Sequence, residues 1–316
     1  VGSIGGNGTA KIKGLSAFSS AGPTDDGRIK PDLVGRGEAL FSSVASSETA
    51  YATLSGTSMA TPNVAGSLVL LQELAIRQYG HPLRAATLKG LVLHTAEDLG
   101  PTGPDYAYGC GLLDTEAEAL HLQAAHREPA ALQERTLPSG DRIEQAFVLD
   151  ETGPVRITLS WTDPPFTPLK RLGKLLLNNR MPTLVNDLNL TLTHTESGVT
   201  YLPYTLSPVN PGAPARNSGN AVDPIEQIFL PAAPAGSYTL AVDAALPLHE
   251  EGTQDFSLVI DGLQTRSVPI QLDTVEVAST IGEVAITWTT AFETTGGLFV
   301  LERAQSIVEG VRGPMQ

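Results

Sequence analysis

The feature that most constrains this 316-residue chain is a change of hydrophobic period near residue 129. Before it, apolar residues recur at helical spacing, and helices are predicted over residues 64–79, from Pro82 onward and over residues 115–126. After it, apolar residues alternate with polar ones, which is typical of half-buried strands. The alternating segments are 155–161, 188–192, 238–242, 256–260 and 284–288, with "PAAPAGS" (231–237) as a turn. The chain therefore predicts an α/β part followed by an antiparallel β-sandwich or jelly roll.

The same change of period predicts the domain boundaries. Residues 1–128 form the first expected domain, and residues 129–263 form the β domain. Residues 264–316 open a further β module that the chain does not finish. Glycine is expected to end the first helix at Gly80, because a left-handed C-cap favours glycine.

Composition excludes several classes of function. There are 20 Lys and Arg against 34 Asp and Glu, which gives a formal net charge of −14. Such a charge repels nucleic acid and anionic membrane surfaces, so we expect neither as a partner. No apolar run approaches the ~20 residues that span a bilayer, and we expect a soluble monomer. The only cysteine, Cys110, allows no intrachain disulfide and is expected to be a buried, unreactive thiol.

One short stretch carries a candidate for chemistry, "LSGTSMATPNVAGSLVLL" at residues 54–71. A nucleophilic serine needs an exposed hydroxyl, a tight turn and free backbone N–H groups that stabilise an oxyanion. Gly56 permits the turn, and Ser58 falls at the start of a predicted helix, where N–H groups are unpaired. Three small residues are expected to let this helix pack closely against a sheet: Ala60, Ala65 and Gly66.

An isolated serine at such a place is more often an ordinary helix cap, and Ser55, Thr57 and Ser58 all have capping side chains. The longer string "GTSMATPNVAG" resembles the serine signature of the subtilisin-like serine proteases, the subtilases. "FSSAGPTDDGRIKPDLVGRG" is similar to the segment that precedes that serine, although the family usually has Ala-Pro-Gly where this chain ends in Val-Gly-Arg-Gly. "GPDYAYGCGLLD" resembles the end of the catalytic domain, with Cys110 where an aromatic residue is commoner.

The β region adds to the resemblance. "LSWTDPP", "LVNDLNL" and "PAGSYTLAV" are similar to the C-terminal β-barrel domain of some secreted bacterial alkaline subtilases, so the likeness covers roughly residues 8–262. "AITWTTAFETTGGLFVLER" resembles the opening of an immunoglobulin-like or fibronectin-like module. The resemblance implies an extracellular, bacterial-type endopeptidase that acts on proteins or peptides.

By this resemblance, Ser58 attacks the scissile carbonyl and its own N–H contributes to the oxyanion hole, which Thr57 helps to shape. The family places the catalytic Asp and His before the serine, whereas the six histidines here all follow Ser58. We therefore expect the Asp, the His and the oxyanion Asn upstream of Val1, and this chain alone to be inactive. No cofactor is required for that chemistry.

Two other interpretations compete with this one. The order Ser, Asp, His of the α/β-hydrolases could be forced onto Ser58, Asp98 or Asp114, and His121 or His126, but that elbow wants glycine where Ala60 stands. The second is an inactive, protease-like secreted scaffold whose β modules bind a partner or a surface.

Metal sites have weak support in the sequence. Asp163 and Asp187 follow or precede predicted strands, in oxygen-rich positions that calcium favours. Solvated or turn-capping carboxylates are the simpler explanation. No group of Cys and His has the spacing of a zinc site.

Overall fold

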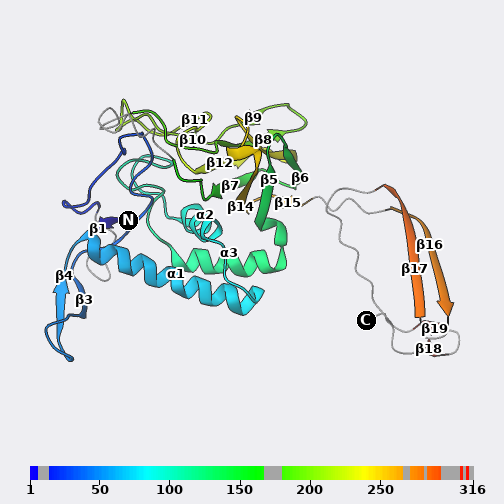
Figure 1. The fold of residues 1–316 in the computed structure, drawn as a ribbon, viewed down its shortest axis with the longest axis horizontal. Helices are drawn as coiled ribbons and strands as arrows, with labels where there is room; N and C mark the ends of the chain where they lie inside the picture. Colours follow the sequence, from blue (N-terminus) through cyan, green and yellow to red (C-terminus); the bar gives the residue numbers. More distant parts are fainter. Residues whose placement is uncertain are drawn as a thin grey trace. The chain divides into compact units, whose positions relative to one another are not determined.

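A computed structural model describes residues 1–5, 14–166 and 180–265, together with the backbone of four strands between residues 271 and 312. The chain forms two compact units, Val1–Thr265 and Arg266–Gln316 (Figure 1). The boundary predicted between residues 128 and 129 falls inside the first unit, at the 3-10 helix Pro129–Ala131.

The first unit contains helices and sheets in the order that the sequence predicts. Its described helices are α1 (Thr57–Tyr79), α2 (Ala85–Thr95), α3 (Thr115–Arg127) and the 3-10 helices η1 (Pro129–Ala131) and η2 (His249–Glu251). The strands of its first part are β1 (Gly2–Ile4), β2 (Val34–Arg36), β3 (Leu40–Ser43) and β4 (Tyr51–Leu54). The long strands of its second part are β5 (Leu132–Pro138), β6 (Ile143–Leu149), β7 (Gly153–Trp161), β8 (Leu188–His194), β12 (Ile225–Ala233), β13 (Gly236–Ala244) and β14 (Thr253–Asp261). The short ones are β9 (Thr200–Tyr201), β10 (Tyr204–Thr205), β11 (Arg216–Asn217) and β15 (Gln264–Thr265).

Strands β1 and β2 pair in parallel, and α1 packs against them. The approach is close because Gly35 has no side chain: a Cβ there would lie 2.8 Å from Val64 Cγ2 and 3.3 Å from the Ala60 carbonyl oxygen. Ala60 is buried against this sheet, as predicted. Ala65 and Gly66 are exposed, so the prediction was wrong for them, because they lie on the opposite side of α1.

The start of α1 differs from the prediction, whereas the end of α1 and the start of α3 agree with it. α1 begins at Thr57, so Pro62 lies in its second turn and not in its first. It ends at Gly80 as expected, with the left-handed φ of 79° and a hydrogen bond from its N–H to the Ile76 carbonyl oxygen. α3 begins after Asp114, whose carboxylate accepts from the Ala117 N–H.

Two antiparallel sheets make up most of the second part. Their strand orders are β12-β7-β14-β5 and β15-β6-β13-β8-β9. The alternating apolar residues predicted for 155–161, 188–192, 238–242 and 256–260 all lie in these strands, and the apolar members are buried in one shared core. The antiparallel arrangement is therefore confirmed, while the jelly-roll connection remains a prediction.

Helix α2 covers the outer face of the β12-β7-β14-β5 sheet (Figure 1). The small polar residues Thr158, Ser160 and Ser257 of this face are fully buried. Ser160 Oγ donates to the Ala86 carbonyl oxygen over 2.8 Å, and Thr87 Oγ1 lies 2.7 Å from Ser257 Oγ. The polar side chains on this face of the strands thus form hydrogen bonds with α2 and are not solvated.

The second unit contains a hairpin of β16 (Gln271–Thr280) and β17 (Glu283–Phe292), paired antiparallel, and the short pair β18 (Ile307–Val308) and β19 (Val311–Arg312). The strand predicted over residues 284–288 is confirmed as part of β17. No helix within the described residues is long and apolar enough to cross a membrane.

Two glycine substitutions in this chain should have opposite effects on stability. Gly37→Ala should lower the free energy of unfolding by about 1–3 kcal/mol, because the new Cβ would meet the Gly56 carbonyl oxygen at 2.6 Å. Gly66→Ala should raise it by about 1 kcal/mol, because the exposed helical position has nothing within 4 Å and alanine favours helix. Urea denaturation of both variants measures the two changes. A stabilising Gly37→Ala would contradict the close approach of these two loops.

A buried carboxyl group in α3 should make stability depend on pH. Burial, with a smaller contribution from Asp114, raises the pKa of Glu118 from 4.5 to about 8. Glu118 therefore stays protonated in the folded state while the unfolded chain loses the proton. Stability from this group is present below pH 4.5 and falls by about 1.4 kcal/mol per pH unit as the pH rises toward 8.

Glu118→Gln should remove this loss, so the variant should be more stable than the parent at pH 8 and similar to it at pH 4. Urea denaturation at several pH values measures the difference. Glu116→Gln, at an exposed position of the same helix, is the control and should follow the parent at every pH. Equal pH profiles for all three proteins would show that Glu118 is ionised in the fold.

Candidate functional site

Ser58 is placed by the junction between the parallel strands and α1. The Gly37 N–H donates to the carbonyl oxygen of Ile4, the last residue of β1, over 3.3 Å. The Gly37 carbonyl oxygen accepts from the Gly56 N–H over 2.8 Å, and Gly56 is the N-cap of α1. Ser58 therefore lies in the first turn of α1, beside the carboxyl ends of β1 and β2. In open α/β sheets, this edge is where ligands bind.

The backbone around Ser58 offers free donors. The N–H groups of Met59 and Ala60 both donate to the Gly56 carbonyl oxygen, at 3.0 and 3.2 Å. Within the described residues, no backbone acceptor pairs with the N–H groups of Thr57 and Ser58. Unpaired N–H groups at a helix N-terminus favour a developing negative charge.

The Ser58 side chain is exposed, and Thr57 is partly exposed. Within residues 1–5, 14–166 and 180–265, no side chain forms a hydrogen bond with the Ser58 hydroxyl. The neighbouring Ser55 behaves as a structural residue, since its Oγ accepts from the Ala39 N–H over 2.9 Å. Ser58 has thus the accessible hydroxyl that a nucleophile requires, and it lacks a base in the described part of the chain.

Each histidine has a partner other than Ser58. The pairs are His81 with the Pro82 carbonyl, His94 and His121 with Asp261, His126 with the Tyr79 ring, His194 with Ser197, and His249 with Glu250. Asp98 accepts from the Gly103 N–H, and Asp114 caps α3. In the described residues, no contact therefore assembles the serine, carboxylate and histidine of an α/β-hydrolase triad.

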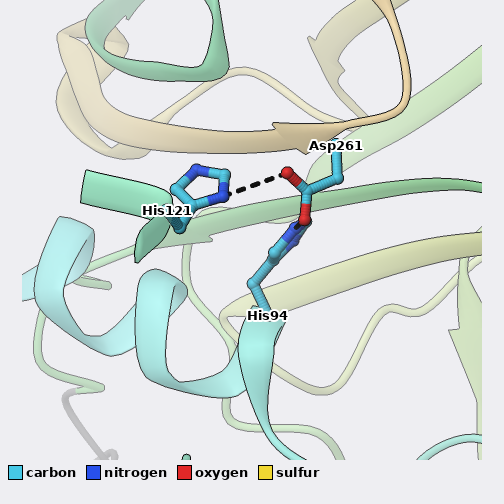
Figure 2. A group of neighbouring side chains, drawn as sticks. All are labelled: His94, His121 and Asp261. Atoms are coloured by element: carbon cyan, nitrogen blue, oxygen red, sulfur yellow. Dashed lines mark hydrogen bonds and ion pairs between the residues drawn. The ribbon is translucent and has the colours of Figure 1, made fainter. Parts of the chain in front are cut away.

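A second cluster joins His94 of α2, His121 of α3 and Asp261 at the end of β14 (Figure 2). His94 Nε2 lies 3.0 Å from Asp261 Oδ2, and His121 Nδ1 lies 3.0 Å from Asp261 Oδ1. Both imidazole rings are buried, whereas the Asp261 side chain is 56% exposed. Sequence spacing missed this cluster because three separate elements supply its members.

Burial and hydrogen bonding set the charges in this cluster. Burial lowers the pKa of His94 to about 4, although Asp261 opposes the shift. Burial alone would raise the pKa of Asp261, but hydrogen bonds with His121 and His94 hold it far below its ordinary range. At neutral pH, Asp261 is therefore a carboxylate and His94 is a neutral imidazole.

The two aspartates proposed for calcium have different surroundings. Asp163 Oδ1 accepts from the Asn186 N–H and Oδ2 from the Val185 N–H, both over 2.8 Å, so Asp163 caps a turn. Asp187 Oδ1 and Glu226 Oε1 are buried and have no hydrogen-bond partner in the described structure. Burial raises the pKa of both carboxyl groups, and the charge of Asp187 adds to the shift of Glu226.

Cys110 is only partly buried, which differs from the expectation of a buried thiol, and its surroundings disfavour the thiolate. Burial raises the pKa of its thiol to about 12, and the carboxylates of Asp32 and Asp223 act in the same direction. The thiolate, which is the reactive form of cysteine, is thus disfavoured at neutral pH.

Known proteins resemble the part of the chain that carries Ser58. Residues 2–111 match the family model described as "Subtilase family". The chain is 52% identical over 71 residues to the C5a peptidase of Streptococcus pyogenes, a match that covers 22% of this chain and 6% of that protein. It is 27% identical over 214 residues to the "Serine protease/ABC transporter B family protein tagA" of Dictyostelium discoideum, covering 56% of this chain and 11% of that protein. The chain thus corresponds to a small part of these relatives.

Solved structures give weaker likenesses. The pre-peptidase C-terminal domain of a Bacillus anthracis collagenase matches with 12% identity and a TM-score of 0.24, covering 41% of this chain and 87% of that one. Tripeptidyl peptidase 2 matches with 11% identity and a TM-score of 0.21, covering 66% of this chain and 26% of that one. These scores do not assign a fold.

The family match covers β1, β2 and α1, whose first turn carries Ser58, so it spans the elements that position this serine. Residues 2–111 of the chain therefore match part of the domain that the subtilase family model describes.

Proposed function

We propose that the chain is part of a serine endopeptidase of the subtilisin-like class, with Ser58 as its nucleophile. The observation that carries the proposal is the placement of Ser58, an exposed hydroxyl beside unpaired N–H groups in the first turn of α1, within the segment that matches the subtilase family.

The mechanism follows from this placement. Ser58 Oγ attacks the peptide carbonyl carbon, and a histidine base takes the hydroxyl proton. The Ser58 N–H donates to the oxyanion, and Thr57 shapes the oxyanion hole from the preceding position. The C–N bond then breaks, the amine leaves with the proton from the histidine, and water hydrolyses the acyl-enzyme. The base and its orienting Asp come from a segment that precedes Val1 in the complete protein.

The exposed apolar side chains of α1 and of the β3–β4 hairpin support such a preceding segment. Large apolar side chains are exposed on α1 and on the β3–β4 hairpin: Val69, Leu70, Ile76, Phe41, Tyr51 and Leu54. Parallel sheets normally have more strands and are covered on both faces, whereas β1 and β2 form a two-stranded sheet within the part of the chain that the structure describes. We propose that the rest of the subtilase domain adds strands to this sheet and covers these side chains.

The substrates in this proposal are proteins or peptides, and the protein acts outside the cell as a monomer. The β domain, by this proposal a jelly roll, stabilises the catalytic domain or presents substrate to it. The rival function is a protease-like scaffold without a working triad, and the Ser58 experiment separates the two.

A structural calcium ion fits one of the two aspartates named from the sequence. Asp187 Oδ1 and Glu226 Oε1 are buried oxygens without a hydrogen-bond partner in the described residues, and coordination to a hard cation satisfies an oxygen of this kind. Asp163 is less suited, because both of its oxygens accept from backbone N–H groups. We propose Asp187 as a calcium ligand, with Glu226 beside it.

Ser58→Ala in the complete protein should abolish labelling by a fluorophosphonate probe and lower peptide hydrolysis by about 10⁴-fold or more. The loss follows because no other group can form the acyl-enzyme. In-gel fluorescence and a peptide assay measure the two effects. Ser67→Ala is the control, because it changes another serine of the same helix, and it should keep both activities.

Persistent labelling of the Ser58→Ala variant would remove Ser58 from its role. A correctly folded parent protein that neither reacts with the probe nor hydrolyses peptides would favour the scaffold.

Addition of Ca²⁺ to chelator-treated chain should raise its melting temperature, and Asp187→Asn should abolish this rise. The reason is that calcium bound by the folded state stabilises it. Differential scanning calorimetry measures the shift. Asp150→Asn, at an exposed position between β6 and β7, should keep it. An equal calcium response in the parent and in Asp187→Asn would exclude Asp187 as a ligand.

A further inference from the structure

We infer that His94, His121 and Asp261 form a zinc site that ties α2 and α3 to the end of β14. The inference does not depend on the role of Ser58, because these residues lie in another part of the first unit and their partners do not include Ser58. Figure 2 shows the two imidazole rings approaching the Asp261 carboxylate from different helices.

The nitrogen and oxygen atoms that face each other form a donor set of suitable size. One ligand atom from each residue can be chosen so that all three lie within 4.8 Å of one another. Zinc binds His nitrogen at about 2.0–2.1 Å and carboxylate oxygen at about 2.0–2.2 Å, so tetrahedral ligand atoms lie about 3.3 Å apart. The separations of 3.0 Å, from His94 Nε2 to Asp261 Oδ2 and from His121 Nδ1 to Asp261 Oδ1, are close to this spacing, and each ring faces a different oxygen of the carboxylate. Rotation of the half-exposed Asp261 side chain can supply the remaining adjustment.

The outer nitrogen of each ring is already held by the protein. His94 Nδ1 lies 2.9 Å from Thr158 Oγ1, and His121 Nε2 lies 3.3 Å from the Ala131 carbonyl oxygen. Zinc-binding histidines almost always donate their other ring N–H to such an acceptor, which fixes the tautomer and the orientation of the ring. Both rings thus have the supporting contacts of metal ligands.

The Ala131 contact decides which nitrogen of His121 carries hydrogen. A carbonyl oxygen only accepts, so Nε2 must donate to it, and a neutral His121 then presents the lone pair of Nδ1 to Asp261. In that tautomer Nδ1 and the carboxylate oxygen, 3.0 Å apart, both present lone pairs, as two ligands of one metal ion do. Without the metal, the hydrogen bond between His121 and Asp261 described above joins the same two atoms.

The ligand types select zinc over the hard cations. Two imidazole nitrogens and one carboxylate oxygen suit zinc, whereas calcium and magnesium prefer oxygen alone. The rings are buried, but the Asp261 side chain is 56% exposed, so an ion can reach the site from solvent and water can complete its coordination.

One neighbouring charge opposes the ion. Arg156 lies opposite Asp261 in the pairing of β7 with β14. Its guanidinium donates to the His94 carbonyl oxygen over 2.6 Å and stacks on the Phe229 ring, 4.6 Å from the ring centre. These contacts hold the cation on the backbone side of His94, and the Asp261 carboxylate offsets part of its charge.

The chelator-treated protein should bind one zinc ion per chain. The measurement is made with excess Ca²⁺, because calcium occupies any sites that prefer hard cations. Isothermal titration with Zn²⁺ gives stoichiometry and affinity, and Co²⁺ as a probe gives a visible spectrum that reports nitrogen ligands. Asp261→Asn should weaken zinc binding by more than about 100-fold, since even changes outside the ligand shell cost about 10–100-fold.

Matched controls separate the site from chance histidine binding. Asp255→Asn changes an aspartate of the same strand with similar exposure, 60% for its side chain, and should bind zinc as the parent does. His126→Ala, in the same helix as His121, should also keep full affinity, whereas His121→Ala should lose it. Circular dichroism of each variant confirms that it is folded.

Failure of the parent chain to bind Zn²⁺ with saturation would overturn the inference and leave the cluster as a hydrogen-bonded His–Asp–His chain. Binding by a folded Asp261→Asn variant with the affinity of the parent would also overturn it. Neither outcome bears on Ser58, because metal affinity is measured and hydrolysis is not.

Discussion

The docking of α2 onto the outer face of β7 and β14 is the constraint on which the first unit depends. Gly90 allows the close approach, because a Cβ there would collide with the Ser160 hydroxyl and lie 3.6 Å from Val259 Cγ2. Buried hydroxyls are costly unless they are paired, so the contacts of α2 with Ser160 and Ser257 fix one position of the helix along the strands. The subtilase-like part and the β sheets consequently share an interface inside one compact unit.

This interface also sets the surroundings of the two sites. α2 delivers His94 to the end of β14, and α3 packs beside α2 and delivers His121 to the same place. α1 packs on α3, where the Tyr79 hydroxyl donates to the Leu122 carbonyl oxygen over 2.8 Å. The far end of α1, where Ser58 lies, is held separately by Gly35 and by the pairing of Gly37 with Gly56.

Local patterns in the sequence were enough to predict the helices and the long alternating strands, and they singled out Ser58, whose role stays a prediction. Strands β5 and β6 were not predicted. Both contain polar residues that are exposed or partly exposed, so the alternation of apolar residues in them is weak. β12 was partly assigned to a turn because of Pro231, but it is an edge strand with an irregular register near that proline, where a missing N–H is tolerated. The start of α1 was placed too late because Pro62 was taken as a first-turn residue.

The His94, His121 and Asp261 cluster could not be predicted in this way. Its members are far apart in the sequence, and no motif joins them, because the packing of two helices on a sheet brings them together. The acceptors that hold the outer nitrogens, Thr158 and the Ala131 carbonyl, come from two further elements. Such a cluster is visible only once the tertiary structure is known.

The position of Pro62 in α1 determines which backbone hydrogen bonds Ser58 can make. Proline has no N–H, so Pro62 cannot donate to the Ser58 carbonyl oxygen in the regular i, i+4 pattern of the helix. The Ser58 N–H precedes the first regular helical hydrogen bonds, so the regular ladder of α1 uses neither the N–H nor the carbonyl oxygen of this residue. The peptide groups on both sides of Ser58 are nevertheless anchored, because the Met59 N–H donates to the Gly56 carbonyl oxygen and the Thr61 hydroxyl donates to the Thr57 carbonyl oxygen, each over 3.0 Å. The backbone of Ser58 is thus fixed by its neighbours, while its own N–H and carbonyl oxygen stay outside the regular helical pattern.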